Sequence, residues 1–216
     1  MQIAANPYNK PMLNLFVVRH GQDQDNANGI LNGHRNQPLT KKGQEQAAEL
    51  ADGIVRLGLH FDDVYTSPLQ RAHKTAEIIA QQLGAPAPHV LPGLIERDFG
   101  VMAGRPIADI TRLCAPDILR TDTITYFLSP EGAETFPQLK ARAQTVLQEV
   151  KRLHTSGNIL LVTHGDMGKM LYAAFYDLPW RAVLEQFHFG NSELLELSIN
   201  RGAEQAHRIR IEQHNL

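Results

Sequence analysis

Two of the ten histidines stand directly after apolar segments, where side chains can do chemistry. The apolar segment 15–18 leads to Arg19 and His20, and the apolar segment 158–163 leads to His164. A neutral imidazole is a competent nucleophile near pH 7, and guanidinium groups match phosphate oxygens through paired N–H donors. These residue types therefore indicate attack on phosphorus, with His20 as the nucleophile and Arg19 as a phosphate ligand.

Further residues are expected to hold a phosphoryl group beside His20. Arg71 falls in the first turn of an expected helix, where a cation opposes the helix dipole and so indicates a bound anion. His164 precedes Gly165 at another expected helix start, whose free backbone N–H groups bind anions. Asn26 adds a neutral donor. With such donors in place the chemistry requires no metal and no other cofactor.

The segments that carry these residues alternate between strands and helices. Apolar, β-branched runs predict strands at 15–18, 61–66, 158–163 and 194–199. Helical periodicity predicts helices at 44–57, 69–83, 135–154 and 166–176. Repetition of strand, polar tip and helix predicts an α/β fold, with a mostly parallel central sheet flanked by helices on both faces. The carboxyl ends of its strands meet at one edge, where such folds bind ligands.

Capping signals predict where two of the helices start. Thr40 fits an N-cap before the first helix. Ser67, with Gln70 three residues later, predicts a capping box before the second. The tail that begins at Gly202 is polar and is expected to extend the last strand as a sheet edge or to remain free.

The domain organisation predicted from these patterns is simple. No linker or charge block divides the 216 residues, so we expect one domain over 13–216, preceded by a flexible tail over 1–12. Residues 100–135 are rich in Gly and Pro and lack periodicity. They are expected to form a small irregular cap over the site, with a short helix or two.

Composition narrows the functional classes. The formal net charge is -2, which argues against binding to nucleic acid or to a membrane surface. Cys114 is the only cysteine, which excludes an intrachain disulfide and any Cys-based zinc cluster. The sequence shows no signal peptide and no apolar run of about 18 residues. We expect a cytoplasmic enzyme that acts on a small phosphate monoester. The sequence is also compatible with a homodimer.

The run 18–22, VRHGQ, with Asn26 beyond it, resembles the opening motif of the histidine phosphatase (phosphoglycerate mutase-like) superfamily. Further landmarks follow in the family's order at 39–43, 67–76, 96–97, 132–135, 162–165 and 178–179. The resemblance implies that His20 becomes phosphorylated while Arg19, Arg71 and His164 bind the phosphoryl group. We also expect Gly21, Gln22, Asp23, Asn26 and Gly165 to bind substrate.

A carboxyl group must protonate the leaving alkoxide and later take a proton from water. Glu96 ends an apolar segment, and burial there would raise its pKa as the role needs. Asp98, two residues on, is the competing candidate. The resemblance favours Glu96, which stands where the family has its acid.

Three functions remain open from the sequence. A metal-independent phosphomonoester hydrolase is favoured, because the run 97–104 resembles the phosphatase branch of the family. A phosphoglycerate mutase would need cations for a second phosphate, and the cap offers mainly Arg105, Arg112 and Arg120. The third is a phospho-ligand-binding module without turnover, in which Asp23, where the family usually has Thr or Ser, is the damaging change.

The two-histidine pattern also has a metal-binding interpretation, which adjacent arginines make electrostatically unfavourable. The remaining histidines lack such a context and are expected to be surface or structural residues: His34, His60, His73, His89, His154, His188, His207 and His214.

Overall fold

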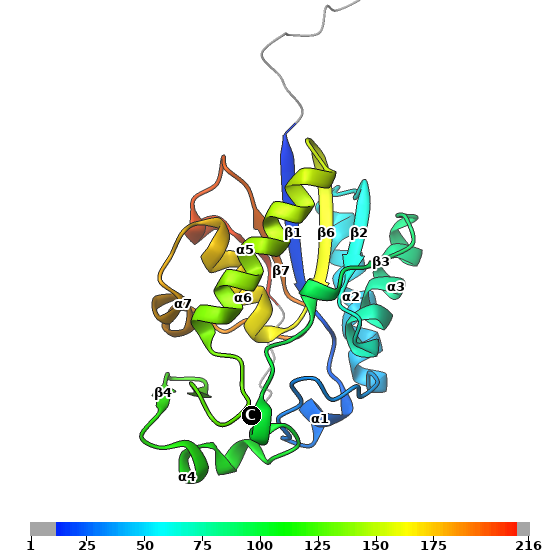
Figure 1. The fold of residues 1–216 in the computed structure, drawn as a ribbon. Helices are drawn as coiled ribbons and strands as arrows, with labels where there is room; N and C mark the ends of the chain where they lie inside the picture. Colours follow the sequence, from blue (N-terminus) through cyan, green and yellow to red (C-terminus); the bar gives the residue numbers. More distant parts are fainter. Residues whose placement is uncertain (1–11, 211–216) are drawn as a thin grey trace, which may run out of the picture.

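The computed structural model describes residues 12–210, which fold around a central sheet (Figure 1). The strands of this sheet are β1 (Leu13–Arg19), β2 (Asp63–Thr66), β3 (His89–Val90), β6 (Gly157–Thr163), β7 (Leu194–Leu197) and β8 (His207–Ile209). Their order across the sheet is β3-β2-β6-β1-β7-β8. The first four of these in space run parallel, and β7 and β8 are antiparallel to their neighbours. The predicted mostly parallel sheet is confirmed.

Helices cover both faces of the sheet, as predicted. One face packs against α2 (Lys41–Arg56) and α3 (Gln70–Leu83). The other packs against α5 (Phe136–Leu153), α6 (Gly165–Phe175) and α7 (Trp180–Gln186). Figure 1 shows these two helical layers on opposite sides of β1 and β6.

Strand β1 is buried on both faces, which explains its unbroken apolar sequence. Leu15 and Val17 point into the core beneath α5 and α6, whereas Phe16 and Val18 point into the core beneath α2 and α3. All four side chains are at most 1% exposed. Because side chains alternate along a strand, a polar residue at any of these positions would enter one core or the other.

The cap expected over the site is present as short elements beyond the carboxyl ends of the strands. They are η2 (Gly100–Met102), η3 (Ile107–Asp109), α4 (Ile110–Cys114) and the antiparallel pair β4 (Ile118–Arg120) and β5 (Thr125–Phe127). A separate small core of Phe99, Met102, Ile110 and Phe127 holds them together. The prediction of a short helix or two is confirmed, whereas the β4–β5 pair was not foreseen.

The predicted capping box at Ser67 and Gln70 is wrong. α3 begins at Gln70, and its N-cap residue, Leu69, makes no side-chain capping bond. Ser67 Oγ instead accepts from the backbone N–H of Leu69 at 3.2 Å and lies 2.7 Å from Nε2 of His164. The side-chain amide of Gln70 donates to the carbonyl of Asn36. Ser67 therefore contacts the His164 side chain instead of capping α3.

Other expectations about the chain ends and caps have clear outcomes. Thr40 is the N-cap of α2, and its hydroxyl accepts from the backbone N–H of Gly43. The polar tail after Gly202 contributes the edge strand β8, with η4 (Ala203–Gln205) before it. The predicted flexible tail, 1–12, lies outside the described residues except for Met12. The short elements α1 (Gln24–Ala27) and η1 (Pro92–Leu94) complete the fold.

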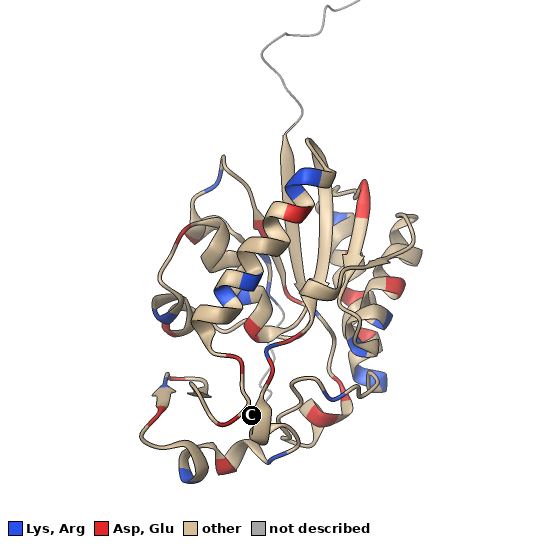
Figure 2. Cartoon of the chain, viewed as in Figure 1, with Lys and Arg blue, Asp and Glu red and all other residues tan. Residues whose placement is uncertain are grey.

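Surface charge is mixed along the helices. Figure 2 shows basic and acidic residues interspersed on α2, α3 and α5. Over residues 12–210, none of the helices combines the length and apolar character that crossing a bilayer demands.

A backbone contact between the segment after His20 and α2 requires two glycines. A Cβ atom on Gly21 would lie 2.2 Å from the carbonyl oxygen of Gly43, and one on Gly43 would lie 2.0 Å from the carbonyl oxygen of Gln22. Neither oxygen belongs to a flexible side chain, so the helix itself would have to move. The loop that carries His20 is thereby pressed directly onto α2.

We expect Gly43→Ala to destabilise the protein by about 1–3 kcal/mol, because the added methyl overpacks two backbones. Gly53→Ala, in the same helix, is the matched control: its Cβ would meet only the end of the Ile209 side chain, at 2.9 Å. Alanine also favours helix over glycine by about 1 kcal/mol. Urea unfolding measures both, and equal free energies of unfolding for the two variants would contradict the prediction.

Candidate active site

The two histidines meet because of the register between two parallel strands. In the pairing of β1 with β6, Arg19 lies opposite Thr163, so His20 and His164 follow at the same level of the sheet edge. The backbone N–H of His20 donates to the carbonyl of Thr163 at 3.0 Å, which continues the ladder by one residue. The two imidazole ring centroids are 5.0 Å apart with an interplanar angle of 63°.

Hydrogen bonds define the tautomer of His20. Its Nδ1 lies 2.7 Å from the carbonyl oxygen of Gly21, which can only accept, so Nδ1 carries the proton. Its Nε2 accepts from Nε of Arg71 at 3.1 Å and therefore presents a lone pair. Burial, followed by the charges of Arg71 and Arg19, holds the pKa of His20 well below its ordinary 6.5. The ring is thus a neutral base whose nucleophilic atom is Nε2.

Arg71 is completely buried, and both of its terminal nitrogens donate to one loop. Nη1 donates to the carbonyl of Arg35 at 2.6 Å, and Nη2 donates to the carbonyl of Gly33 at 2.8 Å. Nε, besides contacting His20, lies 3.1 Å from Oδ2 of Asp23. Arg71 lies beside His20 as predicted, and its guanidinium also fixes the loop around Gly33 and Arg35.

Asp23, the residue that departs from the family pattern, organises its surroundings. Oδ1 accepts from the backbone N–H of Asn26 at 2.7 Å and so caps α1, while Oδ2 accepts from Nδ2 of Asn32 at 2.6 Å. Burial raises the pKa of this carboxyl, and the charge of Arg71 opposes that rise. Asp23 thereby holds in place Asn26, Asn32 and Arg71.

His164 is held by a hydroxyl from the end of β2. Ser67 Oγ accepts from Leu69 N–H and lies 2.7 Å from Nε2 of His164, a contact that either the hydroxyl proton or an imidazole proton on Nε2 satisfies. Nδ1 of His164 is a buried atom without a hydrogen-bond partner within residues 12–210. Burial, followed by the charges of Arg71 and His20, lowers the pKa of His164 well below 6.5.

Glu96 is buried against the start of α6. Oε1 accepts from the backbone N–H groups of Arg97 at 2.8 Å and Met167 at 3.1 Å, and Oε2 accepts from that of Asp166 at 3.4 Å. Burial and then the charge of Asp166 raise the pKa of Glu96, although these donors and Arg71 oppose the rise. Such an environment suits a carboxyl group that must both give and take a proton.

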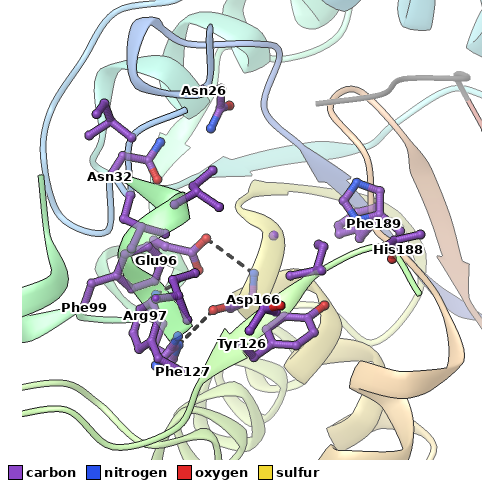
Figure 3. A pocket seen from close by; sticks show the side chains of 18 of the residues that line it. Asn26, Asn32, Glu96, Arg97, Phe99, Tyr126, Phe127, Asp166, His188 and Phe189 are labelled. Atoms are coloured by element: carbon purple, nitrogen blue, oxygen red, sulfur yellow. Dashed lines mark hydrogen bonds and ion pairs between the residues drawn. The ribbon is translucent and has the colours of Figure 1, made fainter. Parts of the chain in front are cut away.

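A cavity of about 450 Å³ lies between the sheet edge and the cap. Of the sequence-predicted residues, Arg19, Asn26, Glu96 and Gly165 line it. Figure 3 shows Asn26 and Glu96 on one side and His188 on the other. The buried His20 and His164 adjoin the lining residues Arg19 and Gly165 in the chain but, like Arg71, do not line the cavity themselves.

Several expected site residues do not line this cavity. Gly21 donates its backbone N–H to Thr75 Oγ1 at 3.1 Å, and Gln22 donates to Gln46 Oε1 at 2.8 Å, so both tie the loop to the helices. Asp98, the competing acid, is half exposed and absent from the cavity wall, where Glu96 lies. The direct substrate contacts predicted for Gly21, Gln22 and Asp23 stay predictions.

Comparison with known proteins identifies the family. The sequence profile of the Histidine phosphatase superfamily (branch 1) matches residues 15–212. The chain belongs to this superfamily. The 2,3-bisphosphoglycerate-dependent phosphoglycerate mutase of Bartonella bacilliformis is 31% identical over 80% of this chain and 85% of its own length. That of Parvibaculum lavamentivorans is 30% identical over 79% and 83%.

Solved structures include phosphatases of similar fold. The α-ribazole phosphatase from Shigella flexneri has a TM-score of 0.71 and 27% identity, with 87% of this chain and 91% of that chain covered. A mycobacterial glucosyl-3-phosphoglycerate phosphatase in complex with VO3 has a TM-score of 0.73, at 24% identity, covering 86% and 90%. The second likeness supports the fold alone.

This histidine phosphatase lines its cavity with residues that the sequence analysis missed. Arg97 pairs with Asp166 at 2.8 Å and lies against the rings of three phenylalanines, Phe99, Phe127 and Phe136. Lys169 also lines the cavity. Its position four residues after Gly165 on a predicted helix indicates that both side chains share one helix face, and this signal could have identified it. Tyr126 and Asn32 come from irregular segments and carry no such signal.

Two histidines expected to be surface or structural also lie near the site. His188 lines the cavity, and burial lowers its pKa to about 3. His34 contacts the carbonyl oxygen of Glu96 through Nε2 at 2.8 Å. Within residues 12–210, no group of three or more His, Cys, Asp or Glu side chains is arranged to hold a metal ion.

The neutral state of His164 makes stability depend on pH. Its pKa is lowered in the folded state, so the unfolded chain takes up the proton first as pH falls through 6.5. One such group costs about 1.4 kcal/mol of unfolding free energy per pH unit below that point. We expect His164→Gln to flatten the measured dependence by about this amount between pH 6.5 and about pH 5.5.

The measurement is urea unfolding at a series of pH values. His60→Gln is the matched control, because it also removes one histidine but at an exposed position that is distant in sequence from His20 and His164. A slope in His164→Gln as steep as that of wild type would contradict the neutral assignment.

Proposed function

We propose that this histidine phosphatase hydrolyses small phosphate monoesters through a phosphohistidine formed at Nε2 of His20. The observation that carries the proposal is the tautomer of this ring. The Gly21 carbonyl keeps the proton on Nδ1, and burial together with the adjacent guanidinium groups lowers the pKa and keeps the ring neutral, so the lone pair is on Nε2 and faces Arg71.

In the first step, the hydrogen bond from Nε of Arg71 to Nε2 of His20 breaks, and Nε2 donates its lone pair to phosphorus while the bond from phosphorus to the ester oxygen breaks. The leaving oxygen takes a proton from Glu96, whose pKa burial raises in the direction that a proton donor needs. The phosphorylated ring gains positive charge, and the hydrogen bond from Nδ1 to the Gly21 carbonyl stabilises that charge.

In the second step, Glu96, now a carboxylate, accepts a proton from water as the water oxygen attacks phosphorus. The bond from phosphorus to Nε2 breaks, and its electron pair returns to His20. Inorganic phosphate leaves, and both groups regain their starting protonation. The chemistry uses side chains alone and needs no metal ion.

Donors around the nucleophile support the transferring group. Arg19 donates from Nη1 to the Phe189 carbonyl at 2.6 Å, and its buried Nε has no hydrogen-bond partner among the described residues. The backbone N–H of Gly165, the first of α6, is a further donor, and Nδ1 of His164 is another in the tautomer that carries its proton there. Preorganised donors of this kind typically each contribute about a hundredfold to the rate.

We expect His20→Ala to abolish release of phosphate from para-nitrophenyl phosphate in the presence of a chelator. Rapid quenching in alkali, which preserves a P–N bond, should recover labelled phosphate on wild type and none on the variant. Glu96→Gln should lower kcat about a hundred- to ten-thousandfold, because the proton donor is lost. Asp98→Asn is the matched control and should lose far less.

Either of two results would contradict this mechanism. Labelled phosphate recovered on His20→Ala would place the covalent step elsewhere, and equal losses in Glu96→Gln and Asp98→Asn would remove Glu96 from its role.

Phosphoglycerate mutase activity is the second candidate, favoured by the curated relatives of that name. The cap arginines available for a second phosphate argue against it. Arg112 pairs with Asp109 on the surface, Arg120 is exposed, and neither these nor Arg105 line the cavity. Incubation with labelled phosphoglycerate separates the two activities, since a hydrolase releases the label and a mutase moves it.

The binding module without turnover depends on Asp23 being damaging. We expect the opposite, because Asp23 positions Arg71 and caps α1. Asp23→Thr, which restores the family's usual residue type, should lower kcat/KM about tenfold or more through loss of the charged hydrogen bonds. Asp25→Asn, which removes a neighbouring carboxylate paired with Arg35, is the control. Higher activity in Asp23→Thr would support the module.

A further inference from the structure

Lys169 is a buried cation on the cavity wall that the mechanism does not use. The residue is 2% exposed, lies on α6 and lines the cavity. Its ammonium group donates to the hydroxyl of Tyr126 and lies 4.9 Å from the centroid of that ring and 5.6 Å from the ring of Phe187. Within residues 12–210, no carboxylate forms an ion pair with it.

A charge in this position is costly unless something compensates it. Burial lowers the pKa of Lys169 to about 8, so the ammonium form still predominates at pH 7. The aromatic rings, one hydroxyl and the carboxylates of Asp166, Glu193 and Glu96, none of them within ion-pair distance, replace only part of the hydration of this ammonium ion. Buried charges in proteins are normally paired. A buried cation on a cavity wall therefore points to an anion that binds in the cavity.

Tyr126 adds a second donor to the same place. Its hydroxyl oxygen accepts from Lys169, so the hydroxyl proton is available to an acceptor in the cavity that both residues line. Burial raises the pKa of Tyr126, which keeps the proton on the oxygen. Figure 3 shows Tyr126 between Asp166 and His188 on the cavity wall.

The helix sets the distance between this group and the phosphate end of the site. Gly165 and Lys169 are four residues apart on α6 and so lie on one face, about 6 Å apart along the axis. Gly165 is at the helix start assigned to the phosphoryl group. An anion bound by Lys169 would thus belong to the leaving group of the same substrate, a few bonds from the ester oxygen.

The rest of the wall limits what that leaving group contains. Arg97 is neutralised by Asp166 and enclosed by phenylalanine rings, and His188 is neutral. Apolar side chains from the cap and the neighbouring loop supply much of the remaining surface, among them Leu31, Phe99, Ile107, Ile110, Ile124 and Phe127. One unpaired ammonium group matches a single monoanion better than a second phosphate dianion.

We propose that Lys169 and Tyr126 form a subsite for one carboxylate of the leaving group, so that the preferred substrates are phosphate monoesters with an apolar body and a carboxylate. This inference rests on the proposed function. It assigns specificity to the second turn of α6 and to β5, outside the residues that hold the phosphoryl group.

The test compares para-carboxyphenyl phosphate with its carboxamide, para-carbamoylphenyl phosphate. These esters share shape and differ in one charge. Wild type is expected to favour the carboxylate in kcat/KM by about ten- to a hundredfold, the effect of a charged hydrogen bond. In Lys169→Met that ratio should fall to near one, and Tyr126→Phe should lower it several-fold.

The exposed Lys41, replaced by methionine, is the matched control and should keep the wild-type ratio. A ratio near one in wild type, or an unchanged ratio in Lys169→Met, would overturn the subsite. If Lys169→Met does not fold, an unchanged ratio in Tyr126→Phe overturns it instead.

Binding separates failure of the subsite from failure of the proposed function. Calorimetry with para-carboxybenzylphosphonate and its carboxamide measures the same preference without turnover. Tighter binding of the carboxylate by wild type, lost in Lys169→Met, supports the subsite even if neither ester is hydrolysed. Equal affinities in wild type overturn it even if both esters are hydrolysed.

Discussion

The pairing of β1 with β6 is the constraint on which the site depends. Both strands are apolar on both faces, so sliding one against the other would misalign the two cores that they share. With Arg19 fixed opposite Thr163, the residues that follow the two strands, His20 and His164, must lie side by side at the sheet edge. The register of the two strands, rather than contacts of the rings themselves, brings the imidazoles together. The Gly21 carbonyl then fixes the tautomer of His20, and Ser67 contacts Nε2 of His164.

The buried charges around the two imidazole rings are offset by neighbouring groups of opposite charge. Burial and then the charge of Arg71 keep His20 neutral, and Asp23 in turn offsets Arg71 at the same Nε atom that contacts the ring. Across the cavity, Glu96 receives backbone donors from α6 while Asp166, paired with Arg97, raises its pKa. Cations thus neighbour the bases, and an anion neighbours the acid. This is the distribution expected where one group must stay unprotonated and another must hold a proton.

Local sequence patterns were enough to predict the fold class and the sheet edge that carries both histidines. Apolar runs on β1 and β6 and the periodicity of α2, α5 and α6 determined the fold class and brought His20 and His164 to one edge. The capping box failed because Ser67 had a tertiary partner, His164, that no local rule represents. Tyr126 and His188 reach the cavity from segments without periodicity, so only the folded chain shows them there. Asp23 departs from the family pattern in the sequence, but its contacts with Asn32 and Arg71 join segments far apart in the chain, so only the folded structure shows them.

Helix α6 joins the two ends of the site through its own geometry. The N–H groups of Asp166 and Met167 in its first turn donate to Glu96, Gly165 at its start lines the cavity, and its second turn carries Lys169. Because the rise of a helix is fixed, these two points keep their spacing whatever the cap does. The cap contributes apolar surface through Phe99 and Phe127, held by a separate small core. Changes there can therefore reshape the pocket for a new leaving group without moving the nucleophile, the acid or the ammonium group.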